Sequence, residues 1–499
     1  MINFFKKYHK WIGIVFTIFI LLFSVSGIVL NHRQLFSGTD VSRDYLPKEY
    51  NYINWNNAAV AGTTQIGEDS ILIYGNIGVW LTDSLASEFE DFNIGFPDGI
   101  DNRKVSKVYY SKSFGLYAGT YFGLFKYNSK VNSWEKVELP IHEQRIVDIT
   151  EKGDELLIVS RSFLLTTVDG KHFEKQTLPE PENYDNKVGL FKTLWIIHSG
   201  EIWGLPGILL VDFIGLIFIF LSITGLIYFL IPFFVRRNKK KSKPTIKNNK
   251  LRRFSLKWHN KIGWITLVLL VITTATGMFL RPPLLAFIAD VKVSKIPYTE
   301  LDSPNPWFDK LRRIMFIESS NRYLVATLDG MYYSDDEFNT PLKKFPEQPP
   351  ISVMGVTAFE LIDDSTLLLG SFEGLFKWNF ITGYKEDYIK KGPIKEKKRG
   401  GPPLGEFLVT GYSNHFNGKE VYFDFNNGAS YISDSRRFIE IPKTISSQPM
   451  SLWNVALEVH TARIYKFMFG GLYILFIPLA GLLILFILIS GFIVWWKRH

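Results

Sequence analysis

The sequence predicts a membrane protein of mixed class, with four transmembrane helices in two parallel repeats and an outward β-propeller-like domain of about six blades, three from each long loop. Three observations lead to this prediction. Hydrophobic residues make up 46% of the 499 positions and gather in a few long apolar runs. The second half of the chain repeats the first, and the segments between the runs read as short aromatic-rich strands. The predicted class is therefore membrane α plus all-β.

Four segments reach the roughly 20 apolar residues that cross a bilayer. They are residues 11–30, 206–235, 262–280 and 467–496. Three lysines precede the first segment, as they would precede the apolar core of a signal peptide. The long apolar run, and its recurrence near residue 259, favour a retained helix.

Basic residues predict the orientation of these spans. The linker 236–258 holds eleven Lys and Arg and no Asp or Glu, and the ends 1–10 and 497–499 add five more. Short basic segments stay in the cytoplasm. Both termini and the linker are thus predicted to be cytoplasmic in a bacterial inner membrane, and the segments 31–197 and 281–459 to be periplasmic.

The charge balance argues against a nucleic-acid partner. The net charge is +9, and without those sixteen basic residues the rest of the chain carries 9 − 16 = −7. The basic linker is therefore interpreted as a topology signal, and contact with anionic headgroups of the lipid bilayer is the less favoured alternative. The chain has no cysteine, which excludes thiolate nucleophiles and thiolate metal sites.

The internal repeat is visible in three places. Residues 8–13 align with 258–263 at an offset of 250, residues 119–126 with 370–377 at an offset of 251, and residues 198–202 with 460–464 at an offset of 262. An insertion at 390–403, rich in Lys, Arg, Gly and Pro, accounts for the last change. Parallel repeats predict a pseudo-twofold axis along the membrane normal, across which duplicated histidines face one another.

The two outward segments contain short alternating strands separated by Gly and Asn turns. Their strongest strand signals recur at intervals of 40 to 55 residues within each half. This period is typical of propeller blades, and one six-bladed ring would leave no sheet edge exposed. Two separate three-sheet lobes are the alternative.

Five of the nine histidines lie near span ends: His9, His32, His198, His259 and His460. Each could be an amphipathic interfacial residue, like the neighbouring tryptophans. The alternative is that opposed imidazoles ligate haem iron, two on the inner and two on the outer side. Nearby glycines would either let a porphyrin edge approach or let helices pack closely; they are Gly13, Gly204, Gly207, Gly263, Gly470 and Gly471.

One pattern carries a family resemblance. It consists of His9 to Gly13, Ser26-Gly27, His198 to Gly207, Thr224-Gly225, His259, Thr276-Gly277, His460 and Ser490-Gly491. It resembles the PepSY-associated transmembrane helix family, which includes inner-membrane ferric-siderophore reductases with two b-type haems. The resemblance implies two haem b groups, with iron held by His9, His259, His198 and His460. The outward loops depart from the family, because they lack a clear PepSY-like module.

Two further residues leave alternatives open. His32 has Pro282 at its repeat position and is either an alternative outer ligand or a surface residue. Asp212 lies inside the second span as a proton relay, a partner of an outer ligand or a hydrated interfacial carboxylate.

The leading expectation is a transmembrane oxidoreductase that passes electrons to a periplasmic acceptor, a ferric chelate or a protein partner. No flavin or nicotinamide motif is present, so the donor would be a quinol or a reductase partner. The alternative is a redox-inactive, membrane-anchored propeller that acts as a sensor or assembly module. A transporter is less favoured, because the spans hold few polar residues.

Overall fold

The chain divides into two compact units in a computed structural model that describes residues 2–352, 354–394 and 404–497. The membrane unit comprises Met1–Phe36, Asn186–Ser303 and Leu452–His499. The β unit comprises Ser37–Asp185 and Pro304–Ser451. Both units therefore draw on both halves of the repeated sequence. Residues 395–403 of the basic insertion and Arg498 of the C-terminal cluster lie outside the described residues.

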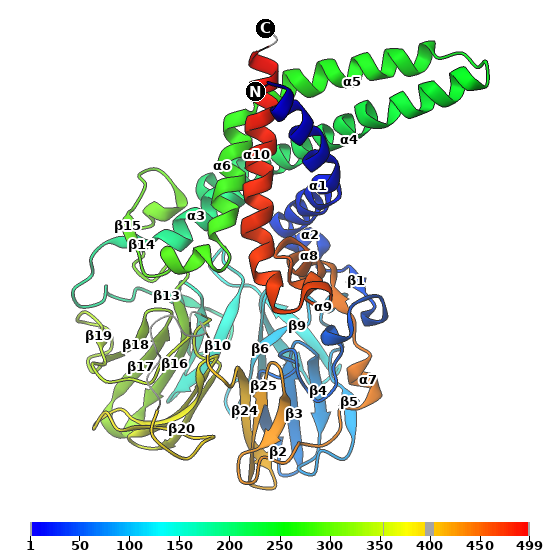
Figure 1. The fold of residues 1–499 in the computed structure, drawn as a ribbon. Helices are drawn as coiled ribbons and strands as arrows, with labels where there is room; N and C mark the ends of the chain where they lie inside the picture. Colours follow the sequence, from blue (N-terminus) through cyan, green and yellow to red (C-terminus); the bar gives the residue numbers. More distant parts are fainter. Residues whose placement is uncertain (1, 353, 395–403, 498–499) are drawn as a thin grey trace. The chain divides into compact units, whose positions relative to one another are not determined.

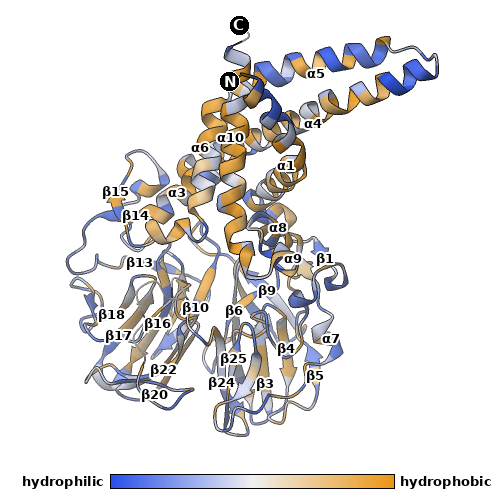
Figure 2. Ribbon diagram, viewed as in Figure 1, coloured by the Kyte–Doolittle hydropathy of each residue, from blue (hydrophilic) through white to orange (hydrophobic). Residues whose placement is uncertain are grey.

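The membrane unit is built on long helices. In Figure 2, α6 (Leu267–Phe279) and α10 (Phe476–Trp496) are orange over most of their length, whereas α5 (Ile246–Ile265) is largely blue. Within the described chain, three stretches are long and apolar enough to cross a membrane: Ile2–Asn31, Glu201–Lys240 and Arg463–Trp496. Ile246–Ile265 and Leu267–Phe279 form a fourth only if they count as one span, because they are bent by 68°. The predicted combination of membrane helices with β-structure is confirmed, and the span count is three, or four with the bent pair.

The bend lies at Thr266, inside the predicted third span. Its Oγ1 donates a hydrogen bond of 2.8 Å to the carbonyl oxygen of Ile262. Thr17 and Thr274 make the same bond within unbroken helices, so this hydrogen bond alone does not account for the bend.

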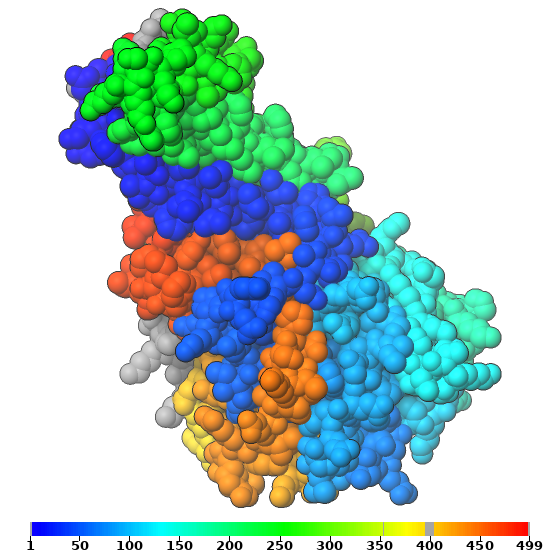
Figure 3. Space-filling view, turned by 90° about the vertical axis from the view of Figure 1, so that its right-hand side faces the viewer, coloured from blue at the N-terminus to red at the C-terminus, as the bar shows by residue number. Residues whose placement is uncertain are grey.

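The helices of the membrane unit are labelled in Figure 1, and Figure 3 shows α1 (blue) against the C-terminal segment (red and orange). They are α1 (Ile2–Asn31), α2 (Arg33–Phe36), α3 (Leu190–Ser199), α4 (Gly204–Lys240), α5 (Ile246–Ile265), α6 (Leu267–Phe279), α8 (Leu452–His460), α9 (Lys466–Phe469) and α10 (Phe476–Trp496), with a small sheet of β14 (Lys187–Gly189) and β15 (Lys292–Ser294).

The β unit contains six small antiparallel sheets, three from each outward segment, each with its strands in chain order. The sheets of the first outward segment are β2 (Gly62–Gly67), β3 (Ser70–Gly75), β4 (Gly78–Thr82) and β5 (Phe89–Asp91); β6 (Val105–Ser111), β7 (Gly115–Thr120), β8 (Leu124–Asn128) and β9 (Ser133–Val137); and β10 (Ile146–Lys152), β11 (Glu155–Ser160), β12 (Leu164–Thr167) and β13 (Glu174–Gln176). The sheets of the second outward segment are β16 (Leu311–Ile317), β17 (Arg322–Thr327), β18 (Gly330–Ser334) and β19 (Lys343–Lys344); β20 (Ala358–Asp363), β21 (Thr366–Ser371), β22 (Gly374–Asn379) and β23 (Lys385–Asp387); and β24 (Val409–Phe416), β25 (Lys419–Asp424) and β26 (Gly428–Tyr431). A short pair, β1 (Asp40–Val41) and β27 (Met450–Ser451), and α7 (Lys443–Ser446) complete the unit.

Hydrophobic clusters join each sheet to the next one along the chain. For example, Leu157 of β11 and Val325 of β17 share one cluster between the third and fourth sheets. Another cluster, which contains Ile73 of β3 and Phe423 of β25, joins the first sheet to the sixth. The packing therefore runs through all six sheets and back to the first.

Hydrogen bonds join the first strands of the sheets in the same order. They are Thr64 Oγ1 to Val108 O (2.7 Å), Ser106 Oγ to Ile146 O (2.5 Å), Ile314 N to Asp148 Oδ2 (3.0 Å), Arg313 Nη2 to Thr357 O (3.1 Å), Thr357 Oγ1 to Val409 O (2.7 Å) and Thr410 Oγ1 to Val60 O (3.1 Å). The last bond returns from the sixth sheet to the residues before β2.

The repeated glycines of the β segments have a packing role. A Cβ on Gly119 would lie 2.7 Å from Ile146 of the following sheet, and one on Gly370 would lie 3.2 Å from Val409. A side chain at either position would push the neighbouring sheet away. This close approach explains why the glycine recurs at corresponding positions of both halves.

Candidate functional site

The inner histidine pair consists of His9 on α1 and His259 on α5. Their ring centres are 6.2 Å apart, and the ring planes are inclined by 79°. The Nδ1 atom of His9 lies 2.9 Å from the carbonyl oxygen of Ile487 on α10. The Nδ1 atom of His259 lies 3.1 Å from the carbonyl oxygen of Leu221 on α4.

The outer histidine pair consists of His198 at the end of α3 and His460 at the end of α8. Their ring centres are 5.9 Å apart, and the planes are inclined by 52°. The Nδ1 atom of His198 lies 3.0 Å from the carbonyl oxygen of Thr273 on α6, and that of His460 lies 3.0 Å from the carbonyl oxygen of Phe23 on α1. The structure thus brings four of the predicted site residues together as two repeat-related pairs.

A hydroxyl three residues after each carbonyl also faces the same Nδ1 atom. The distances are 3.3 Å from Ser490 to His9, 3.1 Å from Thr224 to His259, 3.3 Å from Thr276 to His198 and 3.1 Å from Ser26 to His460. Each hydroxyl donates its proton to a carbonyl of its own helix, so a lone pair is turned to the histidine.

This arrangement determines the tautomer of all four histidines. A carbonyl oxygen can only accept, so each Nδ1 carries a proton, and in the neutral ring each Nε2 therefore keeps its lone pair. Among the described residues, no hydrogen bond reaches these Nε2 atoms. Two imidazoles that bind one metal ion from opposite sides through Nε2 have ring centres about 6 Å apart, since the metal–nitrogen bond is about 2.0 Å and the nitrogen lies about 1.1 Å from its ring centre.

The glycine after each hydroxyl makes room for the histidine ring. A Cβ on Gly277 would lie 2.6 Å from Cε1 of His198, and one on Gly491 would lie 2.9 Å from Cε1 of His9. The corresponding distances are longer at Gly27, 3.2 Å from His460, and at Gly225, 3.4 Å from His259. Each Ser-Gly or Thr-Gly motif thus forms the seat of one histidine, the place where its hydroxyl contacts Nδ1 and its glycine leaves room for the ring. The sequence pattern did not reveal this role.

Each histidine is held by the other half of the chain. His9 and His198 of the first half contact α10 and α6 of the second, while His259 and His460 contact α4 and α1 of the first. Neither half could build a pair alone.

His32 takes a different place from the four paired histidines. Its Nε2 lies 2.6 Å from Oδ2 of Asp212, whose other oxygen accepts a hydrogen bond of 3.0 Å from Asn31. The structure does not bring His32 into the outer pair, and it places the Asp212 carboxylate against His32 rather than against His198 or His460.

The glycines predicted near a porphyrin differ in their surroundings. A Cβ on Gly13, Gly470 or Gly471 would meet no described atom within 4 Å, whereas one on Gly207 would lie 2.0 Å from the carbonyl oxygen of Gly200. Gly207 is therefore a site of close backbone packing. Gly204 has φ +58°, and a Cβ on Gly263 would lie 3.8 Å from Leu221.

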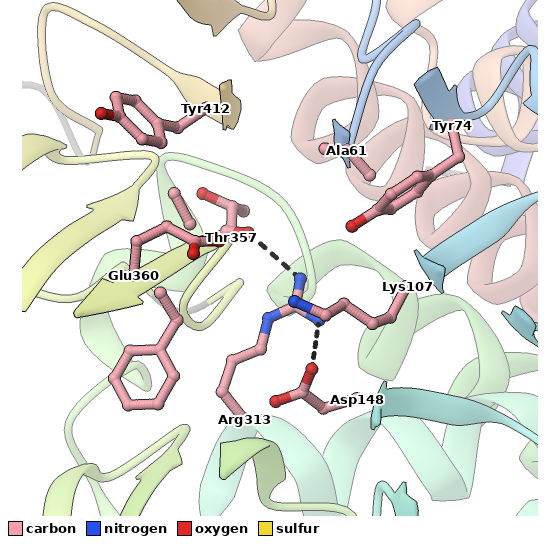
Figure 4. Close-up of a pocket in the computed structure, with 11 residues that line it drawn as sticks. Ala61, Tyr74, Lys107, Asp148, Arg313, Thr357, Glu360 and Tyr412 are labelled. Carbon is pink, nitrogen blue, oxygen red and sulfur yellow. Dashed lines mark hydrogen bonds and ion pairs between the residues drawn. The ribbon is translucent and has the colours of Figure 1, made fainter. Parts of the chain in front are cut away.

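The β unit holds a small polar pocket where the first strands of its sheets converge (Figure 4). Arg313 reaches the carbonyl oxygens of Val147 and Thr357 and lies 3.6 Å from Asp148. Burial opposes the charge of Lys107 in this pocket, but Tyr74, Glu360 and Asp148 outweigh it and raise the pKa of its ammonium. The cavity is about 20 Å³, room for about one water molecule, so a chelate does not fit.

The described part of the basic insertion is its beginning. The Nζ atom of Lys390 lies 2.6 Å from Oε2 of Glu406 and 5.6 Å from the ring centre of Phe407. The other predicted basic residues, apart from Lys391, lie outside the described residues.

The sequence matches the family described as the PepSY-associated TM region twice, over residues 3–231 and 230–498. The protein belongs to the PepSY-associated TM family. The resemblance carried by the histidine and glycine motifs is confirmed, and the two matches meet where the sequence repeats. With its apolar helices, this family member is a membrane protein.

Other comparisons add little. No curated protein matches the PepSY-associated TM protein. The extracellular domain of a protein described as a one-component system from B. thetaiotaomicron has 11% identity and a TM-score of 0.36, with 80% of this chain and 40% of that chain covered. A computationally designed protein has 9% identity and a TM-score of 0.33, with 78% and 90% covered. This chain thus spans 40% of the length of the first, and likenesses of this size support no conclusion.

Proposed function

We propose that this PepSY-associated TM protein is an inner-membrane electron-transfer protein with two b-type haems, one between His9 and His259 and one between His198 and His460. The observation that carries the proposal is the geometry of the two pairs. In both, neutral imidazoles oppose one another at a separation suited to a single iron atom, with Nδ1 bonded and Nε2 available. When bound, haem supplies reversible one-electron chemistry.

The protein groups around the pairs suit a cofactor of this kind. An Nδ1–H that donates to a carbonyl holds the imidazole in one orientation and raises its basicity toward a metal. Both pairs are assembled from helix segments rather than from flexible loops. An interfacial role alone would not require two histidines to meet, nor a glycine beneath each ring.

The two pairs stand at different depths along α1. His9 belongs to the inner pair, and Phe23, fourteen residues later, holds His460 of the outer pair. At a rise of 1.5 Å per residue this separation is about 21 Å along the helix, less than the roughly 30 Å of hydrocarbon. The proposal therefore gives each leaflet one redox centre, between a quinol or reductase partner inside and an acceptor outside.

We infer that the six sheets are the blades of one closed β-propeller in the periplasm. The support is the hydrophobic cluster and the Thr410 bond that lead from the sixth sheet to the first. The polar pocket beside Arg313 is too small for a ferric chelate, so the acceptor, a ferric chelate or a protein, would dock on a surface.

Difference spectroscopy tests the proposal. Reduced-minus-oxidised spectra and pyridine haemochrome assays of the purified protein should give a b-type spectrum with about two haems per chain. His259→Ala and His198→Ala should each lose about one. The matched control is His172→Ala, whose side chain is 88% exposed in the β unit. A colourless protein from haem-replete cells, with folded variants, would leave the redox-inactive anchor as the better account.

A further inference from the structure

One face of α5 carries polar residues beside the inner histidine. Ser255 and Arg252 precede His259 by four and seven residues, so all three lie on one face of the helix. At 1.5 Å per residue, Ser255 is about 6 Å and Arg252 about 10 Å from His259 along the axis.

Two donors on this face lack partners. The Oγ atom of Ser255 and the Nε atom of Arg252 are buried, and neither has a hydrogen-bond partner among the described residues. The guanidinium lies 5.0 Å from the ring centre of Tyr228 on α4, and its hydrogen bond from Nη2 to the Tyr228 hydroxyl is long at 3.5 Å. Buried donors without partners are costly, most of all on a cation, so this arrangement calls for an acceptor that bears negative charge.

We propose that Arg252 and Ser255 bind the propionate carboxylates of the inner haem; this inference rests on the proposed function. Haem b carries two carboxylates at one edge, and guanidinium binds carboxylate through paired hydrogen bonds. The two donors occupy the face of α5 that also presents His259. They are therefore placed to fix which edge of the macrocycle turns to the cytoplasmic side.

The repeat shows that these donors are specific to one half. At the offset of 250 that relates His259 to His9, the positions of Arg252 and Ser255 are occupied by Ile2 and Phe5. An apolar residue cannot bind a carboxylate. At these two positions the duplicated sequence thus supplies propionate donors on α5 and none on α1. The propionate edge of the inner haem would therefore turn toward α5.

A lipid phosphate is another oxyanion that could use the same donors. An apolar cleft of about 410 Å³ between α4 and α5 could take its acyl chain, and is lined by Ile227, Leu230, Ile231, Phe234, Asn238, Asn248 and Leu251. The test must therefore separate a propionate from a lipid.

The test compares protohaem with its dimethyl ester, which lacks the carboxylate charges. Full-length protein carrying His460→Ala, which leaves only the inner pair intact, is made in haem-deficient cells and titrated with each compound while the Soret band is recorded. We expect protohaem to bind more tightly, and Arg252→Gln to reduce this preference by about tenfold or more. Ser255→Ala should reduce it less, and Arg252→Lys should restore part of it.

The matched control is Arg253→Gln, because Arg253 has the same charge but an exposed side chain. It should keep the full preference. An unchanged preference in Arg252→Gln would overturn the assignment. If that variant also loses bound phosphatidylglycerol in native mass spectra, Arg252 binds a lipid phosphate instead. If the His460→Ala protein binds neither compound, the proposed function fails at the inner pair, a result distinct from haem binding without a preference.

Discussion

The inner and outer histidine pairs share their ligand geometry but differ in their polar neighbours. Around the outer pair, several polar and charged groups bind one another: Asp212 lies 2.6 Å from His32, and Arg463 is paired with Glu458. Beside the inner pair, the Arg252 Nε atom has no such partner. Duplication therefore reproduced the seats of the histidines, while residues present in only one half set the surroundings of each pair.

On the outer side, the hydroxyl of Tyr465 is a buried donor without a partner among the described residues. Its ring lies against Phe19 and Phe476, with ring centres 5.8 Å and 5.3 Å away. A neutral phenol among aromatic rings does not attract a carboxylate as a guanidinium with a buried, unpartnered Nε does. Among the described residues, the unpartnered atom on the outer side is thus a neutral hydroxyl, and on the inner side one belongs to a cation.

The largest effects are expected at the glycine seats, which test whether the two pairs hold their histidines in the same way. Gly277→Ala should remove most of the outer haem and Gly491→Ala most of the inner haem, because a methyl group there overlaps the histidine ring. Gly27→Ala and Gly225→Ala should keep nearly two haems per chain. The added methyl group would lie 3.2 Å from the His460 ring at Gly27 and 3.4 Å from the His259 ring at Gly225, against 2.6 Å at Gly277 and 2.9 Å at Gly491. The measurement is haem content by pyridine haemochrome.

The control for this series is Gly13→Ala, whose added methyl group would meet no described atom within 4 Å. Equal haem loss in all four seat variants would show that the glycines act through helix packing in general. Full haem content in Gly277→Ala would show that the His198 ring does not occupy its seat.

The next effect concerns stability on the outer side. His32→Ala should keep both haems and lower the free energy of unfolding by about 1–3 kcal/mol, because the Asp212 carboxylate, whose side chain is 12% exposed in the native protein, loses a partner at 2.6 Å. Thermal unfolding in detergent and haem content measure the two parts. Loss of the outer haem in this variant would make His32 a ligand and end the equivalence of the pairs.

A smaller effect sharpens the contrast in unpartnered donors. Tyr465→Phe should leave haem content unchanged and stabilise the protein by up to about 1 kcal/mol, because it removes a buried hydroxyl and keeps both ring contacts. Ser255→Ala should weaken haem retention in the loaded protein. If Tyr465→Phe lowers outer haem content instead, the Tyr465 hydroxyl helps to bind the outer haem. The two pairs would then both use an unpartnered donor and would not differ in this respect.

The smallest effects belong to the hydroxyls at the seats. Ser26→Ala and Thr224→Val leave the carbonyl bond to His460 or His259 in place and remove only the second acceptor of Nδ1–H. We expect a rise of the midpoint potential on the order of 20 mV, the one-electron equivalent of about 0.5 kcal/mol, and the same rise at both pairs. Redox titration followed in the visible spectrum measures it, and a large shift at one pair only would contradict the shared geometry.

Much of the architecture could be predicted from local sequence. Apolar runs of about 20 residues predicted the membrane helices, and the blade-like spacing predicted three sheets from each outward segment, because hydropathy and alternation are local properties. The repeat offsets predicted that His9 faces His259 and that His198 faces His460, since equal positions in parallel repeats are related by one axis.

Other features depended on contacts between residues far apart in the chain. Pattern alone did not show that Phe23 and Ser26 hold His460, that Asp212 binds His32, or that the third span bends at Thr266. Nor did it distinguish Arg252 from the ten other basic residues of its segment. A sequence determines which residues are apolar, basic or duplicated, whereas the partner of a buried polar atom is decided only when the chain packs and water is excluded.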